Sequence, residues 1–341
     1  MTFDPSAAAL PGSGIYGLPT SEEDARVVLL PVPWDATTSY GGGAADGPSA
    51  ILSASKQVDL FDREVGRPYE AGIFLREESP LVRAWNDEAR AAAKPVIDAG
   101  GAGDDAALRA KLGVVNDLSE KVNKWTYDMT RALLAAGKIV GVVGGDHAAP
   151  YGAIRAHAEK HPGMGILHVD AHADLRDAYE GFAFSHASIL HNVATRLPQV
   201  SKIVQLGIRD FSEDEGKFAW ESHGRIVTHF DADWARARLE GATFKSLVDD
   251  ALAALPNEVY VTFDIDGLDP ALCPSTGTPV PGGFSFHEAA YLFAAVVRSG
   301  RRIVGFDLNE VAPGPDGDEW DGNVGARLLY KLIGWTLRSR E

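Results

Sequence analysis

The sequence has 341 residues, of which 45% are hydrophobic and 23% charged, a balance typical of a globular chain rather than a disordered or fibrous one. A formal net charge of −16 makes nucleic acid and anionic membrane surfaces poor partners and favours a cationic small molecule. The N-terminus lacks the features of a secretory signal, and no apolar run reaches the roughly 18 residues that span a membrane. The single cysteine, Cys273, excludes an internal disulfide, so we expect a cytoplasmic protein.

Short apolar runs rich in β-branched residues alternate along the chain with longer amphipathic segments. This alternation predicts an α/β fold with a mainly parallel sheet covered on both faces. The predicted strands cover residues 27–33, 138–144, 164–170, 202–208, 258–264 and 302–308. The predicted helices cover residues 47–60, 117–136, 149–160, 186–196, 244–255, 286–299 and 322–338.

The chain shows no internal repeat and no second core, so we expect a single domain over residues 1–341. Within it we expect an N-terminal extension over about residues 1–25. Residues 77–117 break the alternation because they are rich in alanine, glycine and charge. They are interpreted as an insertion that contains a helix or two and a glycine turn.

Aspartate and histidine are concentrated just after three of the predicted strands, in the segments GGDHAAP, HVDAHADLR and TFDIDGLDP. Because the carboxyl ends of parallel strands meet at one edge of a sheet, these side chains are expected to converge. Spacing of two residues in DAHAD and DID is expected to point alternate side chains the same way, as in an extended strand. Buried carboxylates repel one another unless a cation separates them, and a mixture of carboxylate and imidazole suits manganese or its neighbours. The candidate ligands are His147, Asp170, His172, Asp174, Asp264 and Asp266.

With TGTPVPGG and DLNEVAP, these segments resemble the motif set of the ureohydrolase superfamily, which includes arginase, agmatinase and formiminoglutamase. The resemblance implies a three-layer α/β/α sandwich with two divalent metal ions per chain, Mn²⁺ or alternatively Ni²⁺. It implies that Asp170 and Asp264 bridge the two ions, and that the chain forms a homotrimer or homohexamer. One ion would be held by His147, Asp170, Asp174 and Asp264, and the other by Asp170, His172, Asp264 and Asp266.

The same resemblance assigns roles in cleaving a guanidinium C–N bond with water. The metal pair would activate the water, and Asp174 would pass a proton to the departing nitrogen. His186, in FSHAS, matches the histidine that shuttles protons to solvent, and Glu310, in DLNEV, matches the glutamate that receives the guanidinium. Thr278 is expected to face the substrate from the TGTPVPGG loop.

Residues 175–185 lack the Asn and Ser with which arginases hold the amino-acid end of arginine, so arginine is not the expected substrate. The motif sequences are closer to those of agmatinases, although the segment YGGGAADGP lacks the arginines that are usual in the corresponding segment of agmatinases. We therefore expect an agmatine-like compound or guanidine itself. Arg176 leaves open a formiminoglutamase or guanidino-acid hydrolase if it binds an acidic tail, or it pairs with Asp177 or Glu180. A non-catalytic subunit and a single-zinc deacetylase are the alternatives from other classes.

Overall fold

The strands form one parallel sheet in the order β2-β1-β3-β8-β7-β4-β5-β6 in the computed structural model, which describes residues 3–10 and 12–341. All six predicted strands are confirmed to within two residues. The strand bounds are β1 Val27–Val32, β2 Ile73–Leu75, β3 Ile139–Gly144, β4 Gly165–Val169, β5 Lys202–Ile208, β6 Ile226–Phe230, β7 Glu258–Asp264 and β8 Arg302–Asn309. The sequence did not predict β2 and β6, which form the two edges of the sheet.

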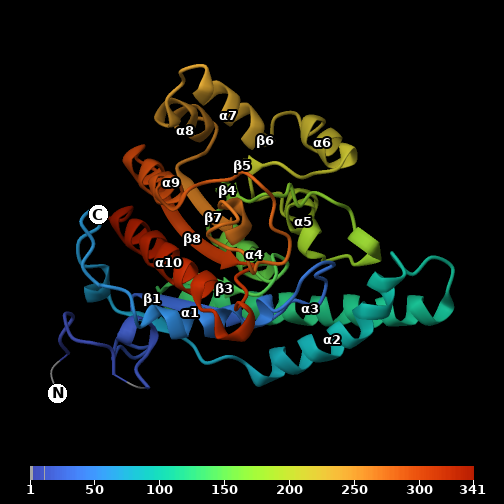
Figure 1. The fold of residues 1–341 in the computed structure, drawn as a ribbon, viewed down its shortest axis with the longest axis horizontal. Helices are drawn as coiled ribbons and strands as arrows, with labels where there is room; N and C mark the ends of the chain where they lie inside the picture. Colours follow the sequence, from blue (N-terminus) through green and yellow to red (C-terminus); the bar gives the residue numbers. More distant parts are fainter. Residues whose placement is uncertain (1–2, 11) are drawn as a thin grey trace.

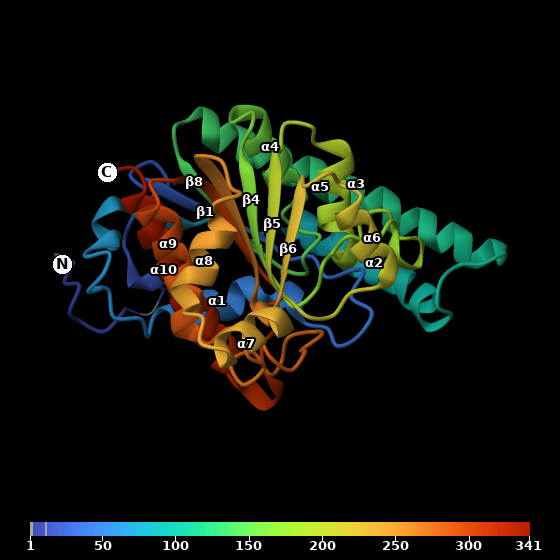
Figure 2. The same cartoon turned by 90° about the horizontal axis from the view of Figure 1, so that it is seen from above.

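Helices cover both faces of this sheet, which confirms the three-layer α/β/α architecture (Figures 1 and 2). One layer contains α1, α8, α9 and α10, and the other contains α2, α3, α4 and α5, while α6 and α7 lie beside the edge strand β6. The helix bounds are α1 Gly47–Ser55, α2 Pro80–Asp98, α3 Ala106–Ala135, α4 Tyr151–Lys160, α5 Ile189–Arg196, α6 Glu213–Trp220, α7 Asp231–Leu239, α8 Phe244–Leu252, α9 Phe286–Arg298 and α10 Trp320–Arg338. The sequence did not predict α2 in detail, nor the short helices α6 and α7.

The segment interpreted as an insertion forms α2 and the first part of α3, which lie side by side and project beyond the sheet (Figures 1 and 2). The helix predicted over residues 117–136 is longer, since it begins at Ala106. It begins there because the carboxylate of Asp105 accepts hydrogen bonds from the N–H groups of Ala107 and Leu108. Gly100, Gly101 and Gly103 have positive φ angles in the turn between the two helices.

The N-terminal segment packs on the last helix. Tyr16 is buried, its hydroxyl donates to the carbonyl of Ala326 at 3.1 Å, and its N–H donates to the hydroxyl of Ser55 at 2.9 Å. Residues before α1 are thereby tied to α10. Within residues 3–10 and 12–341, no helix combines the length and the apolar character that crossing a bilayer requires.

Four neighbouring strands in the middle of the sheet, β3, β8, β7 and β4, carry the polar motifs at their carboxyl ends. The chain passes from β3 to β4 across the positions of β8 and β7, which it fills later. The neighbouring strands β7 and β4 therefore connect in opposite directions, β7 toward β8 and β4 toward β5, and such a change of direction opens a crevice at the carboxyl edge of a parallel sheet. The fold therefore places the candidate ligands together in a crevice, although they are far apart in sequence.

Candidate metal centre

The six candidate ligands follow three of these four strands. His147 lies in the turn after β3, Asp170 follows β4 directly, and Asp264 is the last residue of β7. His172 and Asp174 lie just beyond Asp170, and Asp266 lies in the short 3-10 turn Ile265–Gly267. All of them are buried except His172, whose side chain is 24% exposed.

The local backbone differs from the extended strand ends that the sequence suggested. β4 ends at Val169, and Asp174 has a φ angle of 54°, in the left-handed region. Its carbonyl accepts hydrogen bonds from the N–H groups of Leu190 and His191, which hold this conformation. Asp264 accepts a hydrogen bond from the N–H of Asp266 at 2.8 Å across a turn. The ligands lie together as the sequence predicted. Tight turns bring their side chains together, however, and not the alternation of an extended strand.

The ring of His147 is oriented by hydrogen bonds on both sides. Its Nε2 lies 2.8 Å from the hydroxyl of Thr262, and that hydroxyl donates to Asp307 at 2.8 Å. Because the hydroxyl proton is used by Asp307, Thr262 accepts from Nε2–H, which leaves Nδ1 as the nitrogen that faces the site. Nδ1 lies 2.9 Å from Asp170 Oδ2, 3.0 Å from Asp174 Oδ2 and 3.5 Å from Asp264 Oδ2.

A second group of ligand atoms forms around His172. Its Nδ1 lies 3.0 Å from Asp266 Oδ2 and 3.5 Å from Asp170 Oδ1. Asp170 therefore faces both histidines, one with each carboxylate oxygen. Two groups of donors that could each hold an ion share this aspartate. One comprises His147, His168, Asp170 and Asp174, and the other comprises Asp170, His172 and Asp266. Asp264 belongs to neither tight group, although its Oδ2 lies beside His147.

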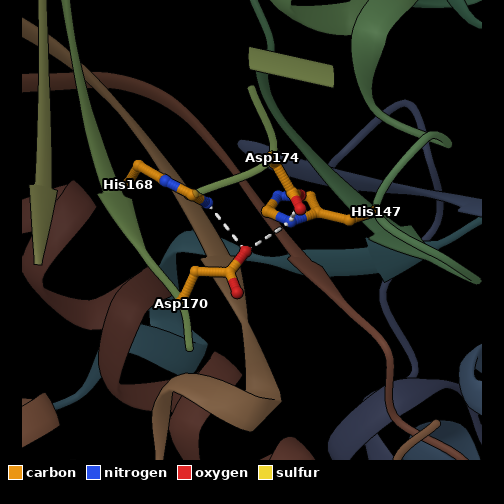
Figure 3. Close-up of side chains that lie close together, drawn as sticks. All are labelled: His147, His168, Asp170 and Asp174. Carbon is orange, nitrogen blue, oxygen red and sulfur yellow. Dashed lines mark hydrogen bonds and ion pairs between the residues drawn. The ribbon is translucent and has the colours of Figure 1, made fainter. Parts of the chain in front are cut away.

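His168, which the sequence analysis did not single out, lies against Asp170 (Figure 3). Its Nε2 is 2.8 Å from Asp170 Oδ2, and its Nδ1 is 3.0 Å from the side-chain amide of Gln205. That amide nitrogen also donates to the carbonyl of Ala173, and the amide oxygen accepts from Thr228. Gln205 thus donates to His168 Nδ1, so Nε2 carries the proton and donates to Asp170. His168 orients Asp170 rather than offering a lone pair to an ion.

The electrostatics of the cluster fit a divalent cation. Burial and the neighbouring carboxylates, Asp266 foremost, hold the pKa of Asp264 well above its ordinary value. Burial and Asp170 raise the pKa of Asp174 to about 6. Burial lowers the pKa of His172, but Asp266 and Asp170 outweigh this effect and raise it to about 12. Carboxylates that resist ionising beside an imidazole that holds its proton indicate a buried site short of positive charge, which metal ions would supply.

Glu310 follows β8 and enters the same crevice. Its Oε1 accepts a hydrogen bond from the N–H of His147 at 2.9 Å, while its buried Oε2 has no partner among the described residues. The residue has a φ angle of 61°, held by bonds from its N–H to Gly145 and from the Thr276 hydroxyl to its carbonyl. A strained backbone that turns an unsatisfied carboxylate into a crevice is characteristic of a ligand site.

A small chamber of about 150 Å³ lies beside the cluster, and His172, Asp174, His186 and Thr278 are among the residues that line it. His186 Nδ1 lies 3.4 Å from the hydroxyl of Thr37, and its ring faces Tyr179 edge-on. Burial and the charge of His172 lower the pKa of His186 to about 4, so its imidazole is neutral at neutral pH. The Thr278 hydroxyl lies 3.4 Å from Asp266 Oδ2.

Arg176 also lines the chamber, but its charge is already compensated. Its Nε lies 3.3 Å from Glu215 Oε2, and its guanidinium lies over the ring of Tyr179 at 4.5 Å. The partner is therefore Glu215, and not Asp177 or Glu180. His191, on α5, is only 16% exposed, and its ring packs on Phe218.

The eight-stranded parallel sheet with helices on both faces, and the buried histidine and aspartate cluster at its carboxyl edge, define an α/β/α protein with a site suited to metal ions. The sequence model of the arginase family matches residues 25–334, and the chain belongs to this family. It is a hydrolase that acts on C–N bonds of amidines, of the agmatinase type.

Similar proteins support this placement. The N(1)-aminopropylagmatine ureohydrolase of Thermus thermophilus is 35% identical over 316 residues, which cover 92% of each chain. The mitochondrial agmatinase of Gallus gallus is 31% identical over 323 residues, 92% of this chain and 82% of the relative. Two solved structures share the fold. The agmatine ureohydrolase of Thermoplasma volcanium has a TM-score of 0.72 at 23% identity, covering 96% of both chains. The proclavaminate amidino hydrolase of Streptomyces clavuligerus has a TM-score of 0.74 at 24% identity, covering 98% of this chain and 100% of the other.

Proposed function

We propose that this protein hydrolyses a small guanidino compound and releases urea, using two divalent ions held by the six candidate ligands. His147, Asp170, Asp174 and Asp264 would hold one ion, and Asp170, His172, Asp264 and Asp266 the other. Mn²⁺ is the proposed metal and Ni²⁺ the alternative, since carboxylate and imidazole donors accept both. When bound, the ions would supply the Lewis-acid activation of a water molecule at neutral pH.

The observation that carries the choice of substrate is the unsatisfied carboxylate oxygen of Glu310. A buried carboxylate without a cation is costly, and a guanidinium offers parallel N–H donors in a charge-assisted contact. Burial and Asp146 hold the pKa of Glu310 well above its ordinary value, which is the signature of a carboxyl group that needs such a partner. Glu310 therefore positions the guanidinium beside the cluster.

The remaining groups move protons. Water adds through its oxygen to the guanidinium carbon, the C–N bond breaks, and both protons of the water end on the departing nitrogen. Asp174 is placed to pass the first of these protons. His186 lines the same chamber as a neutral imidazole, so it can exchange a proton with solvent. The products are urea and an amine, or urea and ammonium when guanidine is the substrate.

The chamber has room for a guanidinium group. Its volume is about 150 Å³, and Asp174, His186 and Thr278 are among the residues that line it. The guanidino-acid alternative needs Arg176 to bind the carboxylate of the substrate, but the guanidinium of Arg176 already forms an ion pair with Glu215. The relatives are named for agmatine and aminopropylagmatine, so agmatine leads the candidates, followed by guanidine.

Urea release should be measured side by side from guanidine, methylguanidine, agmatine, aminopropylagmatine, guanidinobutyrate, formiminoglutamate and arginine. We expect agmatine or guanidine to have the highest kcat/KM. Glu310→Gln should lower kcat/KM for every cationic substrate, because it removes the compensating charge from a desolvated site. Arginine as the best substrate would contradict the interpretation of the loop after Asp174, and an acidic substrate would move Arg176 to the centre of the site.

We also propose that the chain forms a homotrimer or homohexamer, because it resembles the family. We propose that it is cytoplasmic, because its single cysteine excludes an internal disulfide. Light scattering at micromolar concentration should report a trimer or a hexamer. A monomer under the same conditions would reject this assembly.

A further inference from the structure

The loop between β1 and α1, residues 33–46, is held from outside by α2, a helix of the segment interpreted as an insertion. This β1–α1 loop contains no lysine, arginine or histidine of its own. It does contain Asp35, which is only 2% exposed. A buried aspartate needs a cation or several hydrogen-bond donors. The N–H of Gly43, in the loop itself, donates to Asp35 Oδ2 at 3.0 Å, and α2 supplies further donors.

Two side chains of α2 bind both the backbone and the carboxylate of Asp35. The side-chain oxygen of Asn86 accepts from the N–H of Asp35 at 2.8 Å, and its amide donates to Asp35 Oδ1 at 3.1 Å. Arg90 Nη1 lies 2.8 Å from Asp35 Oδ2 and donates to the carbonyl of Asp35 at 3.0 Å. Gly42 lies close enough to Arg90 that a Cβ there would sit 3.0 Å from Nη2. The loop is folded against the helix along much of its length.

The inner side of the same loop touches the chamber. The hydroxyl of Thr37, two residues after Asp35, accepts a hydrogen bond from the N–H of His186 at 3.0 Å. It also donates to the buried Asp146 at 3.2 Å and lies 3.4 Å from the His186 ring. Gly41 approaches Gly277 so closely that a Cβ would lie 2.7 Å from its carbonyl oxygen. The loop therefore connects α2 to His186 and to the rim that carries Thr278.

We propose that α2 is a positioning element for the proton-transfer side of the site: Asn86 and Arg90 fix Asp35, and the loop so fixed holds Thr37 against His186. This inference rests on the proposed function for its kinetic consequence. It assigns a role to the insertion that the motifs left unexplained. Arg90 and Asn86 touch neither the chamber nor the candidate ligands, so they are positioning residues.

The test compares Arg90→Gln with Lys94→Gln. Both variants remove one positive charge from α2, but Lys94 is 76% exposed and its ion pair is with Asp98 on the same helix. Hydrogen exchange of residues 35–47, metal content, and kcat and KM for the best guanidino substrate are measured for each. We expect R90Q to speed exchange in this segment and to lower kcat about tenfold with metal content unchanged. K94Q should match the unaltered protein, and R90K should recover part of the loss.

A double-mutant cycle with His186→Ala separates positioning from general weakening. If α2 acts through Thr37 on His186, R90Q should lower kcat by no more than about twofold in the H186A background. Equal losses in both backgrounds, faster exchange over the whole chain, or no change in exchange of residues 35–47 would each overturn the proposal. If R90Q does not fold, Asn86→Ala is subjected to the same cycle. Absence of urea release from the unaltered protein would refute the proposed function. The hydrogen-exchange result would still show whether Arg90 holds the β1–α1 loop.

Discussion

At the scale of single residues, the site depends on side chains that fix the ligands as much as on the ligands. His147 presents Nδ1 because the hydroxyl of Thr262, which donates to Asp307, accepts from Nε2–H. Asp170 is oriented by His168, which Gln205 fixes in turn. Such partners set the tautomer and direction of a metal ligand. Each is buried in a strand of the sheet, so the core of the fold orients the chemistry at its edge.

Replacing Thr262 with valine tests this arrangement. The substitution keeps the shape but removes the hydroxyl, so His147 loses its hydrogen-bond acceptor and Asp307 loses a donor. We expect metal affinity to fall by about 10–100-fold. Thr336→Val is the matched control, because Thr336 is also buried and its hydroxyl has no partner among the described residues. Titration of the metal-free proteins with Mn²⁺ measures both, and equal affinities for T262V and T336V would contradict the assigned role.

At the scale of elements, the strands that carry the ligands are held by close helix packing, which depends on small residues. α4 begins just after the His147 turn and packs on α3 at Gly152. A Cβ at this glycine would lie 2.1 Å from the carbonyl oxygen of Asn123 and 2.7 Å from the nitrogen of Tyr127. Backbone atoms cannot yield as the end of a flexible side chain can, so this contact requires glycine.

Gly152→Ala should lower the free energy of unfolding by about 1–3 kcal/mol, the usual cost of overpacking. Gly113 is the matched control on α3, since a Cβ there meets nothing within 4 Å. Gly113→Ala should stabilise the protein by up to about 1 kcal/mol, because alanine favours a helix over glycine. Chemical denaturation measures both changes, and the same sign for the two variants would show that this contact is not as close as described.

The limits of sequence-based prediction also follow from the elements. The six central strands were predictable because their continuous apolar character reflects cover on both faces, whereas β6, with Thr228 and His229, lies at an edge and is only partly buried after Ile226. The six candidate ligands were predictable from their motifs. The residues that orient them were not, since a polar residue inside an apolar strand looks like an interruption. The spacing of two between His168 and Asp170 was the available signal, because it places both on one face.

At the scale of the whole molecule, we expect the stability of the fold to depend on pH through a buried histidine. His157, on α4, is fully buried against Tyr260, its Nδ1 donates to the carbonyl of Ala153, and its Nε2 has no partner among the described residues. Burial lowers its pKa to about 3. The folded protein therefore keeps this ring neutral at pH values where the unfolded chain binds a proton.

The sign of the effect follows from this difference. Below the unfolded pKa of roughly 6.5 the unfolded chain takes up a proton that the folded chain does not, so stability falls by about 1.4 kcal/mol per pH unit toward pH 3. His157→Gln removes this contribution. Unfolding of both proteins between pH 4 and pH 6, in chelator so that metal release adds nothing, should give a shallower pH dependence for H157Q. Equal slopes would show that His157 is protonated in the folded protein.

The central claim is that two ions in this site make the protein a hydrolase of guanidino compounds. The most direct measurement is urea release from agmatine and from guanidine while the metal-free protein is titrated with Mn²⁺ and, separately, with Ni²⁺. Activity should rise with added metal and level off at about two ions per chain, as expected for a two-metal site. Asp170→Asn and Asp264→Asn should abolish both binding and turnover, because each is proposed to bridge the ions. Saturation at a single ion, or full activity in either variant, would contradict the account.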